Sequence, residues 1–325
     1  MGKERLICSL RSSPLWMSSR EAGQFSEQSA IAEGLDVVWY WRKYRGVRDP
    51  VFSWADCVSD YLQSAGPQYR SPNLGFDELW YRHEYREVEE AINASAYHSG
   101  WEHYLTEGAS QQYNPAFWFD ERWYRRQNPE VETAVRDGYF DCGFEHYLLY
   151  GMARDLSPSM YFNLAWYREK YMQDLEISGA RSYPLVHYFL MDPKRRPAPA
   201  PFFDAAWYSK QYGSSIMSDA EMQSAPAYEH YILFGRRLGY SPSAYFDESA
   251  YRRMYPEVAK KLQSRMYASG FEHYAQEGPA NGYLRPMHLG QTGTEYSGPE
   301  FLELYERSLR LHLTHLKQLD DLCRS

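Results

Sequence analysis

The stretch GFEHYLLYG, residues 143–151, recurs along the chain and decides its fold. Related phrases are GWEHYLTEG at 100–108, AYEHYILFG at 227–235, GFEHYAQEG at 270–278 and a weaker LVHYFL at 185–190. The motif histidines are His103, His146, His187, His230 and His273, which stand 43, 41, 43 and 43 residues apart. A period this regular is the sequence signature of a repeat architecture.

A second motif recurs with the same spacing. It reads FDELWYRHEY at 76–85, FDERWYRRQN at 119–128, FNLAWYREKY at 162–171, FDAAWYSKQY at 203–212 and FDESAYRRMY at 246–255. A proline precedes each new repeat, at Pro115, Pro158, Pro201 (or Pro197) and Pro242, and Pro286 closes the last one. One step earlier, LDVVWYWRKY at 35–44 fits the pattern, and Asp60 stands in place of the histidine. We therefore expect five repeats over 76–286 behind a degenerate capping repeat over 35–75.

The local signals inside a repeat are helical. Asp120 is a suitable N-cap for ERWYRRQ, and Pro129 can occupy the first position of a second helix that ends before Gly138. In the third segment, Phe144, Tyr147 and Leu148 form a short apolar face. Helices of about two turns are marginal alone and need tertiary contacts. The predicted fold is all-α, with three short helices per repeat stacked into a solenoid-like array.

The segments outside the array differ in composition. Residues 1–34 are rich in Ser, Glu and Gln and are expected to form a flexible N-terminal arm, and 287–299 is a Gly-rich linker. Residues 300–325 are predicted to form an amphipathic helix, whose seam includes Leu302, Tyr305, Leu309, Leu316 and Leu319. Three uses of this helix stay open: self-association through 300–323 as a homo-oligomer, folding back as a cap, or docking to a partner.

Composition narrows the function. The 325 residues carry a formal net charge of −8, which argues against a nucleic-acid surface. No apolar run is long enough for a membrane span, and the first residues lack a secretory signal, so we expect a cytoplasmic protein that reaches membranes only through partners. The four cysteines, Cys8, Cys57, Cys142 and Cys323, are far apart and suggest neither a zinc site nor a disulfide framework.

The Glu-His-Tyr motif invites a catalytic interpretation that its spacing disfavours. Consecutive helical residues point about 100° apart, so Glu145, His146 and Tyr147 cannot converge on one substrate atom. We expect each motif histidine to be structural and to pack or hydrogen-bond against the adjoining repeat. Phosphate-loop, nucleophile-elbow and metalloprotease motifs are missing from the sequence. We therefore predict no catalytic, cofactor-binding or metal-binding residue, and no enzymatic activity.

The Trp-Tyr pairs allow two interpretations. The first is core packing. The second is a row of exposed rings with neighbouring arginines that binds a sugar polymer by multivalency. Its residues are Trp80, Trp123, Trp166 and Trp207, with Arg82, Arg125, Arg168 and Arg252.

The order of motifs in FDERWYRRQNPEVETAV…GFEHYLLYG…SP resembles a family of tandem repeats found in bacterial proteins. In that family the repeats are often attached to glycosyltransferases and related proteins of cell-surface polysaccharide biosynthesis, where their role is accessory. The resemblance implies a non-enzymatic scaffold that binds a partner protein such as a polysaccharide biosynthesis enzyme. The alternatives are a carbohydrate-binding array and, as the weakest, an accessory part of a glycosyltransferase.

Overall fold

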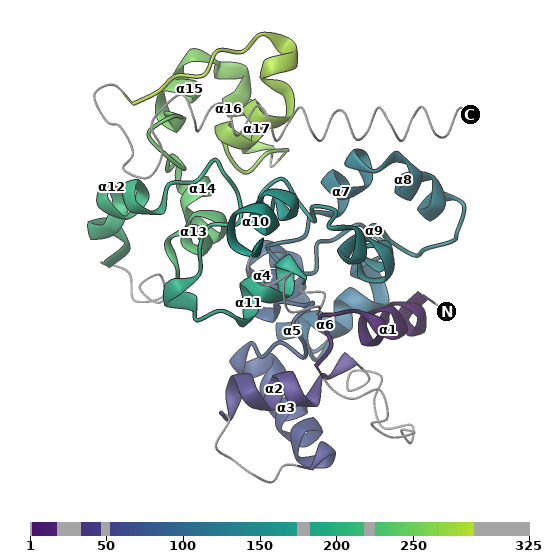
Figure 1. Ribbon diagram of the computed structural model, residues 1–325. Helices are drawn as coiled ribbons and strands as arrows, with labels where there is room; N and C mark the ends of the chain where they lie inside the picture. The colour runs from purple at the N-terminus through teal and green to yellow at the C-terminus, as the bar shows by residue number, and fades with distance from the viewer. Residues whose placement is uncertain are drawn as a thin grey trace. The chain divides into compact units, whose positions relative to one another are not determined.

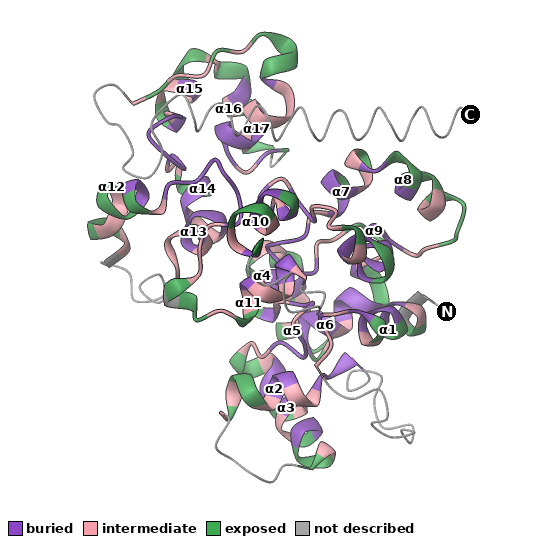
Figure 2. Cartoon of the chain, in the orientation of Figure 1, coloured by how far each residue is buried: buried purple, intermediate pink, exposed green. Residues whose placement is uncertain are grey.

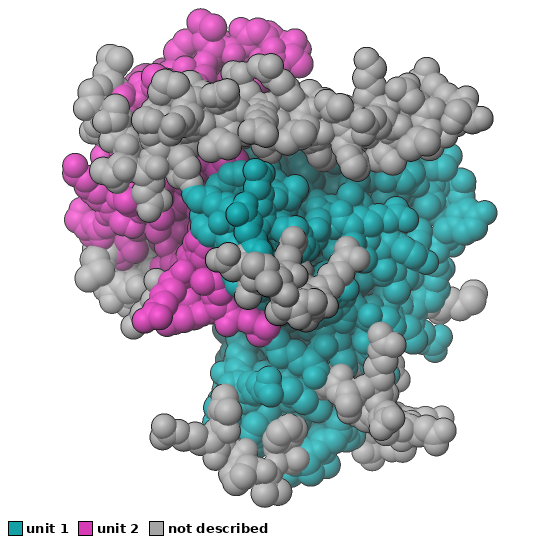
Figure 3. All heavy atoms as spheres, in the orientation of Figure 1, with its two compact units in different colours: residues 1–187 teal, residues 188–325 magenta. Residues whose placement is uncertain are grey.

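The computed structural model describes residues 2–17, 34–46, 53–173, 183–217, 225–264 and 266–288. Over these ranges every regular element is a helix and no strand occurs, so the prediction of an all-α fold is confirmed (Figure 1). The chain divides into two compact units, residues 1–187 and 188–325 (Figure 3). No helix in the described ranges is both long enough and apolar enough to cross a membrane.

The helices follow the repeat. The first unit holds α1 (Gly2–Ser12), α2 (Val37–Tyr44), α3 (Trp54–Gln68), α4 (Glu78–Glu84), α5 (Arg86–Asn93), α6 (Gly100–His103), α7 (Glu121–Gln127), α8 (Pro129–Arg136), α9 (Gly143–His146) and α10 (Leu164–Tyr171). The α11 helix (Pro184–Leu190) spans the division between the units. The second unit holds α12 (Ala205–Met217), α13 (Ala227–His230), α14 (Arg236–Leu238), α15 (Glu248–Met254), α16 (Pro256–Gln263) and α17 (Gly270–Glu277). Short π-helical turns extend α6, α9 and α13 as η2 (Tyr104–Gly108), η3 (Tyr147–Gly151) and η7 (Tyr231–Gly235). The 3₁₀ turns in the described residues include η4 (Met152–Arg154), η6 (Pro193–Arg195) and η8 (Pro279–Asn281).

One aspartate links the start of a repeat to its end. The Asp120 carboxylate accepts a hydrogen bond from the Trp123 backbone amide and so caps α7, as predicted. The backbone amide of Asp120 donates to the Pro158 carbonyl at 3.0 Å. The same backbone bond joins Asp77 to Pro115 and Asp247 to Pro286. The Phe-Asp motif at the start of each of these repeats is therefore hydrogen-bonded to the proline at its end.

The interior of a repeat is aromatic. In the repeat that starts at Phe119, this ring lies 5.0 Å from Phe144, 5.3 Å from Tyr124 and 5.4 Å from Tyr147. Phe119 and Phe144 are 1 % exposed, and the two tyrosines are fully buried. Along these short helices buried residues are interspersed with exposed ones (Figure 2). The high aromatic content of the chain is thus used to fill small cores with few, large side chains.

The prediction of a flexible arm over 1–34 is wrong for residues 2–17. Helix α1 packs against α9, η2 and η3, and it buries Leu6, Ile7 and Leu10 to 1–2 % exposure. Its polar face is held by the Arg5 guanidinium, 3.3 Å from Asp141. Three apolar residues within five positions were sufficient to bury one helix face, although the surrounding segment is polar in composition.

Other predicted segments lie outside the described residues. These are 18–33 of the predicted arm, 289–299 of the linker and the whole predicted amphipathic helix over 300–325. The candidate self-association residues Leu302, Tyr305, Leu309, Leu316 and Leu319 belong to the last of these ranges.

Candidate functional site

Each motif histidine is hydrogen-bonded through Nδ1 to the tyrosine of the Trp-Tyr phrase. The tyrosine hydroxyl lies 2.8–3.0 Å from Nδ1 in all five pairs, which are Tyr81–His103, Tyr124–His146, Tyr167–His187, Tyr208–His230 and Tyr251–His273. Both members of a pair belong to the same repeat. The expectation that each motif histidine packs or hydrogen-bonds against the adjoining repeat is therefore wrong for the hydrogen bond, which joins two helices of one repeat.

Burial fixes the protonation of these pairs. It lowers the pKa of His103, His187 and His273, and it lowers the pKa of His146 to about 4. Burial also raises the pKa of Tyr81 and Tyr124 far above the usual value. Both partners are thus neutral, and the tautomer of the imidazole ring sets which of the two atoms donates. The pair is a hydrogen bond between two neutral groups.

The glycine five residues after the histidine makes room for this bond. A Cβ atom added at Gly108, Gly151 or Gly235 would lie 2.2, 2.4 or 2.1 Å from the hydroxyl of the paired tyrosine. Any larger residue would have to displace the hydroxyl from the histidine. The Trp-Tyr motif, the Glu-His-Tyr motif and the glycine therefore recur together because all three are needed for the tyrosine–histidine hydrogen bond.

The degenerate repeat keeps the same arrangement with another acceptor. In α2 and α3, the Tyr40 hydroxyl donates to Asp60 Oδ2 at 2.8 Å, and Arg70 donates to the same oxygen at 2.6 Å. Asp60 occupies the position that the sequence assigns to the missing histidine. Because the Asp60 carboxylate is charged and partly buried, it requires a cation beside it, and the Arg70 guanidinium provides this charge.

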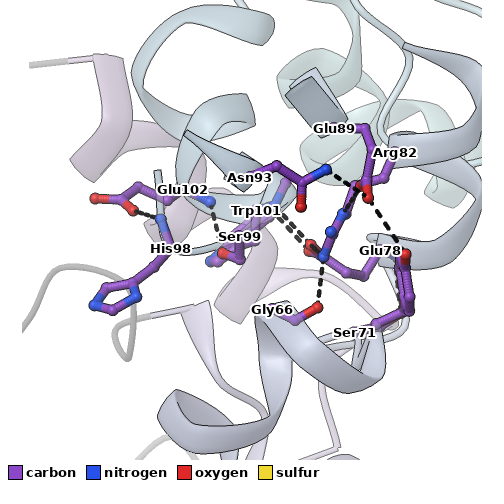
Figure 4. A network of polar contacts seen from close by, with 12 residues as sticks. Gly66, Ser71, Glu78, Arg82, Glu89, Asn93, His98, Ser99, Trp101 and Glu102 are labelled. Atoms are coloured by element: carbon purple, nitrogen blue, oxygen red, sulfur yellow. Dashed lines mark hydrogen bonds and ion pairs between the residues drawn. The ribbon is translucent and has the colours of Figure 1, made fainter. Parts of the chain in front are cut away.

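A buried glutamate caps the third helix in three repeats. Each carboxylate accepts hydrogen bonds from two successive backbone amides at 2.6–3.1 Å: Glu78 from Gly100 and Trp101, Glu121 from Gly143 and Phe144, and Glu248 from Gly270 and Phe271. Figure 4 shows the Glu78 network, in which Arg82 also lies close. Burial raises the pKa of Glu78 to about 8 and that of Glu121 to about 6.

The glutamate and a glycine occur together. A Cβ atom at Gly100 would lie 3.2 Å from Glu78 Oε1 and 2.9 Å from Tyr81 Cδ1, so the carboxylate can approach the helix end only at glycine. Two of the five histidine-containing repeats have neither residue: Leu164 stands with Pro184, and Ala205 with Ala227. Sequence reasoning missed these glutamates, although this joint presence and absence was visible in the sequence.

The Trp and Arg side chains do not form the exposed row that the second interpretation required. Trp80, Trp123, Trp166 and Trp207 are only 6–9 % exposed. Each arginine is paired with a carboxylate: Arg82 with Glu89, Arg125 with Glu132, Arg168 with Asp155 and Arg252 with Glu248. The tryptophan faces are covered by protein, so they cannot stack on sugar rings.

A different group of aromatic side chains is exposed in the repeat over 119–158. Tyr139, in the loop between α8 and α9, is 72 % exposed, and Leu149 and Tyr150 of η3 are 37 % and 46 % exposed. Phe140 is half-buried and packs edge-to-face on Tyr150 at 5.9 Å. We call these four residues the aromatic patch.

Equivalent positions in two other repeats are polar. In these repeats the tyrosine six residues before the histidine donates its hydroxyl to the glutamate four residues after it, as Tyr97 does to Glu107 and Tyr267 to Glu277. In the repeat over 119–158, Phe140 and Tyr150 take these two positions. The patch thus has apolar side chains at the positions where the other two repeats have a Tyr–Glu hydrogen bond. Sequence reasoning missed it, because it looked for what the repeats share and not for where one repeat departs.

Comparisons with protein-family models, with curated proteins and with solved structures give no match to this chain. Within the described ranges, no group of three or more His, Cys, Asp or Glu side chains is arranged to hold a metal ion. Cys8, Cys57 and Cys142 are free thiols.

Proposed function

We propose that this protein is a non-enzymatic helical repeat scaffold that binds a partner protein through the aromatic patch of Tyr139, Phe140, Leu149 and Tyr150. The observation that carries the proposal is a difference between this repeat and two others. Where those two repeats join the equivalent positions by a Tyr–Glu hydrogen bond, this one exposes a cluster of apolar side chains.

The composition of the patch supports a protein partner. Tyrosine, other aromatic residues and arginine are enriched at the centres of protein interfaces, because they bury much area with little loss of side-chain entropy. The Arg154 guanidinium lies 6.0 Å from the centre of the Tyr150 ring and adds a cation beside the apolar surface. The patch is built on η3 and on a loop that the Arg5–Asp141 ion pair ties to α1. Its backbone is therefore anchored at several points.

The setting of the proposal comes from the family resemblance. It places the scaffold in bacterial cell-surface polysaccharide biosynthesis, in the cytoplasm or at the membrane through its partner, and the partner is an enzyme of that process. A second candidate is direct carbohydrate binding, now by the exposed Tyr139 and Tyr150 rings in place of the buried tryptophans.

A swap within the chain tests the patch. Changing Tyr139→Ala, Phe140→Tyr, Leu149→Thr and Tyr150→Glu installs the residues that the repeat over 76–115 has at Ala96, Tyr97, Thr106 and Glu107. Because that repeat folds with these residues, the swap should remove the patch and keep the fold. Leu79→Thr is the matched control, because Leu79 is a 48 % exposed side chain outside the patch.

The measurement is quantitative affinity purification from host cells, followed by reconstitution with the purified polysaccharide biosynthesis enzyme that is recovered. At least tenfold weaker binding by the swap variant, with Leu79→Thr unchanged, supports the proposal. Equal binding by both variants refutes it. A calorimetric titration with the host's surface polysaccharide decides the second candidate, since saturable binding that the swap abolishes assigns the patch to sugar.

A further inference from the structure

Successive repeats are joined by one aromatic side chain. In the first compact unit, Phe144 lies against the preceding repeat, 6.3 Å from the Tyr104 ring, and a Cβ atom on Gly75 would lie 3.5 Å from its Cζ. In the second compact unit, Phe271 packs 4.6 Å from Phe202, which belongs to the preceding repeat. The residue after the motif glycine therefore reaches back into its predecessor in both places.

The last repeat, over 246–288, has a hollow where such a side chain would enter. Its walls include Tyr245, Phe246, Phe271, Tyr274 and Arg285. These aromatic positions correspond to Gly75, Phe76, Trp101 and Tyr104 in the repeat that receives Phe144. The hollow is shallow and partly open to solvent.

The exposure of Tyr274 is an independent sign of a missing neighbour. The tyrosine that follows the motif histidine, or Asp60 in the first repeat, is almost fully buried in the five earlier repeats: Tyr61, Tyr104, Tyr147 and Tyr231 are 0 % exposed and Tyr188 is 1 % exposed. Tyr274 is half-buried. The next residue, Ala275, replaces the large apolar Leu105, Leu148 or Ile232 of other repeats. The side of the last repeat that would face a further repeat is thus partly uncovered.

We infer that this hollow is the docking site of the chain's own segment 300–306, with Phe301 as the inserted side chain. The chain length allows this. The described residues end at His288, whose backbone amide donates to the Ala244 carbonyl at 2.9 Å, one residue from Tyr245 on the hollow wall. Thirteen residue steps separate His288 from Phe301, and they can span at most about 45 Å.

Charge and apolar surface favour the same occupant. Glu300 and Glu303 flank Phe301 in the sequence, and Arg285 on the wall offers the complementary charge. Beside Arg285, Leu284 is 68 % exposed and Met287 is 46 % exposed, which provides an apolar shoulder for Leu302 and Leu304.

The other end of the array provides a precedent. Gly75 stands where later repeats have a large side chain such as Trp118 or Tyr245, and a Cβ atom there would lie 2.9 Å from Leu10 Cδ1 of α1. A segment outside the repeats thus already fills a vacancy beside Phe144. Docking of 300–306 would close the array at its C-terminal side by the same means.

Photo-crosslinking of the full chain tests the inference. The photoreactive analogue p-benzoylphenylalanine replaces Tyr274, a conservative aromatic exchange, and in a control protein it replaces the exposed Tyr139. Crosslinked peptides are identified by mass spectrometry over a range of protein concentrations. We expect an intramolecular crosslink from position 274 to 300–306 whose yield does not depend on concentration. Crosslinks between two chains, to another segment or to no segment overturn the inference.

Two further variants distinguish insertion of Phe301 into the hollow from non-specific hydrophobic association of the segment. Phe301→Ser should reduce the crosslink from position 274 at least fivefold, whereas Leu311→Ser should leave it unchanged. Circular dichroism confirms that both variants retain their helices. Equal yields in the two variants overturn the assignment of Phe301. The crosslinking experiment needs no partner protein. The docking inference can therefore be refuted while the aromatic patch binds a partner, and the patch can fail to bind while the docking inference holds.

Discussion

The Tyr124 hydroxyl lies 2.9 Å from His146 Nδ1, and this bond joins α7 to the end of α9 across 22 residues of chain. Its equivalents recur in the four other histidine-containing repeats, and Tyr40 with Asp60 repeats it in the first. The Glu-His-Tyr motif, which resembles an active site repeated five times, thus supplies a hydrogen bond that holds two helices of each repeat together.

Removing the hydroxyl should loosen one repeat. Tyr124→Phe keeps the ring in the core but leaves Nδ1 of the buried His146 without its hydrogen-bond partner, which costs about 1–3 kcal/mol. Urea unfolding followed by circular dichroism measures the loss. The control is Tyr139→Phe, which removes a hydroxyl from a 72 % exposed ring and should change stability by less than about 0.5 kcal/mol. Equal midpoints for the two variants would contradict the structural role.

The glycine beside the bond should tolerate no side chain. In Gly151→Ala the new Cβ would lie 2.4 Å from the Tyr124 hydroxyl, so we expect destabilisation of about 1–3 kcal/mol from overpacking. Gly213→Ala is the control, because nothing lies within 4 Å of a Cβ placed there inside α12, and it should gain up to about 1 kcal/mol.

Coupling between the two sites gives a sharper test. The double variant Tyr124→Phe, Gly151→Ala should be less destabilised than the sum of its parts, because loss of the hydroxyl removes the closer of two clashes, the other being 2.7 Å to Tyr147 Cδ2. Strict additivity would show that the glycine is required for another reason.

The sequence predicted those features that depend on neighbouring residues. The Asp120 cap and the helix that starts at Pro129 follow from local hydrogen bonding, and both are present. The pairing of Glu121 with amides 22 and 23 residues later depends on how helices pack, and no local preference reveals it. Helix α1 was missed because only three apolar side chains, within a polar segment, decide its burial. The aromatic patch was missed because Phe140 and Tyr150 are informative only when compared with Tyr97 and Glu107 in another repeat.

Acid should remove the contribution that the neutral His146 ring makes to stability. Burial lowers the pKa of His146 from 6.5 to about 4, so the folded state favours the neutral ring. Its contribution is complete above pH 6.5 and is lost as the pH falls toward 4, by about 3 kcal/mol. Burial raises the pKa of Glu121 to about 6 and that of Glu78 to about 8, and both shifts act in the opposite direction as the pH falls. The test therefore compares His146→Gln with the unchanged chain at pH 7, 5.5 and 4.5 by urea unfolding. The variant should lose less stability on acidification, and identical pH dependence would show that His146 is not buried as a neutral ring.

The buried glutamate and its glycine should behave as one exchangeable pair. Glu78→Leu leaves the amides of Gly100 and Trp101 without their acceptor, and we expect a loss of about 2–3 kcal/mol. Adding Gly100→Pro reproduces the Leu164 and Pro184 combination of another repeat and removes one of the two orphaned amides. Proline at the first position of a helix is well tolerated, so the double variant should recover part of the loss. Gly100→Pro alone should be the worst of the three, because a side chain there meets the Glu78 carboxylate and the Tyr81 ring. A complete double-mutant cycle by urea unfolding measures the coupling. A double variant less stable than either single variant would mean that the two solutions to capping this helix are not interchangeable between repeats.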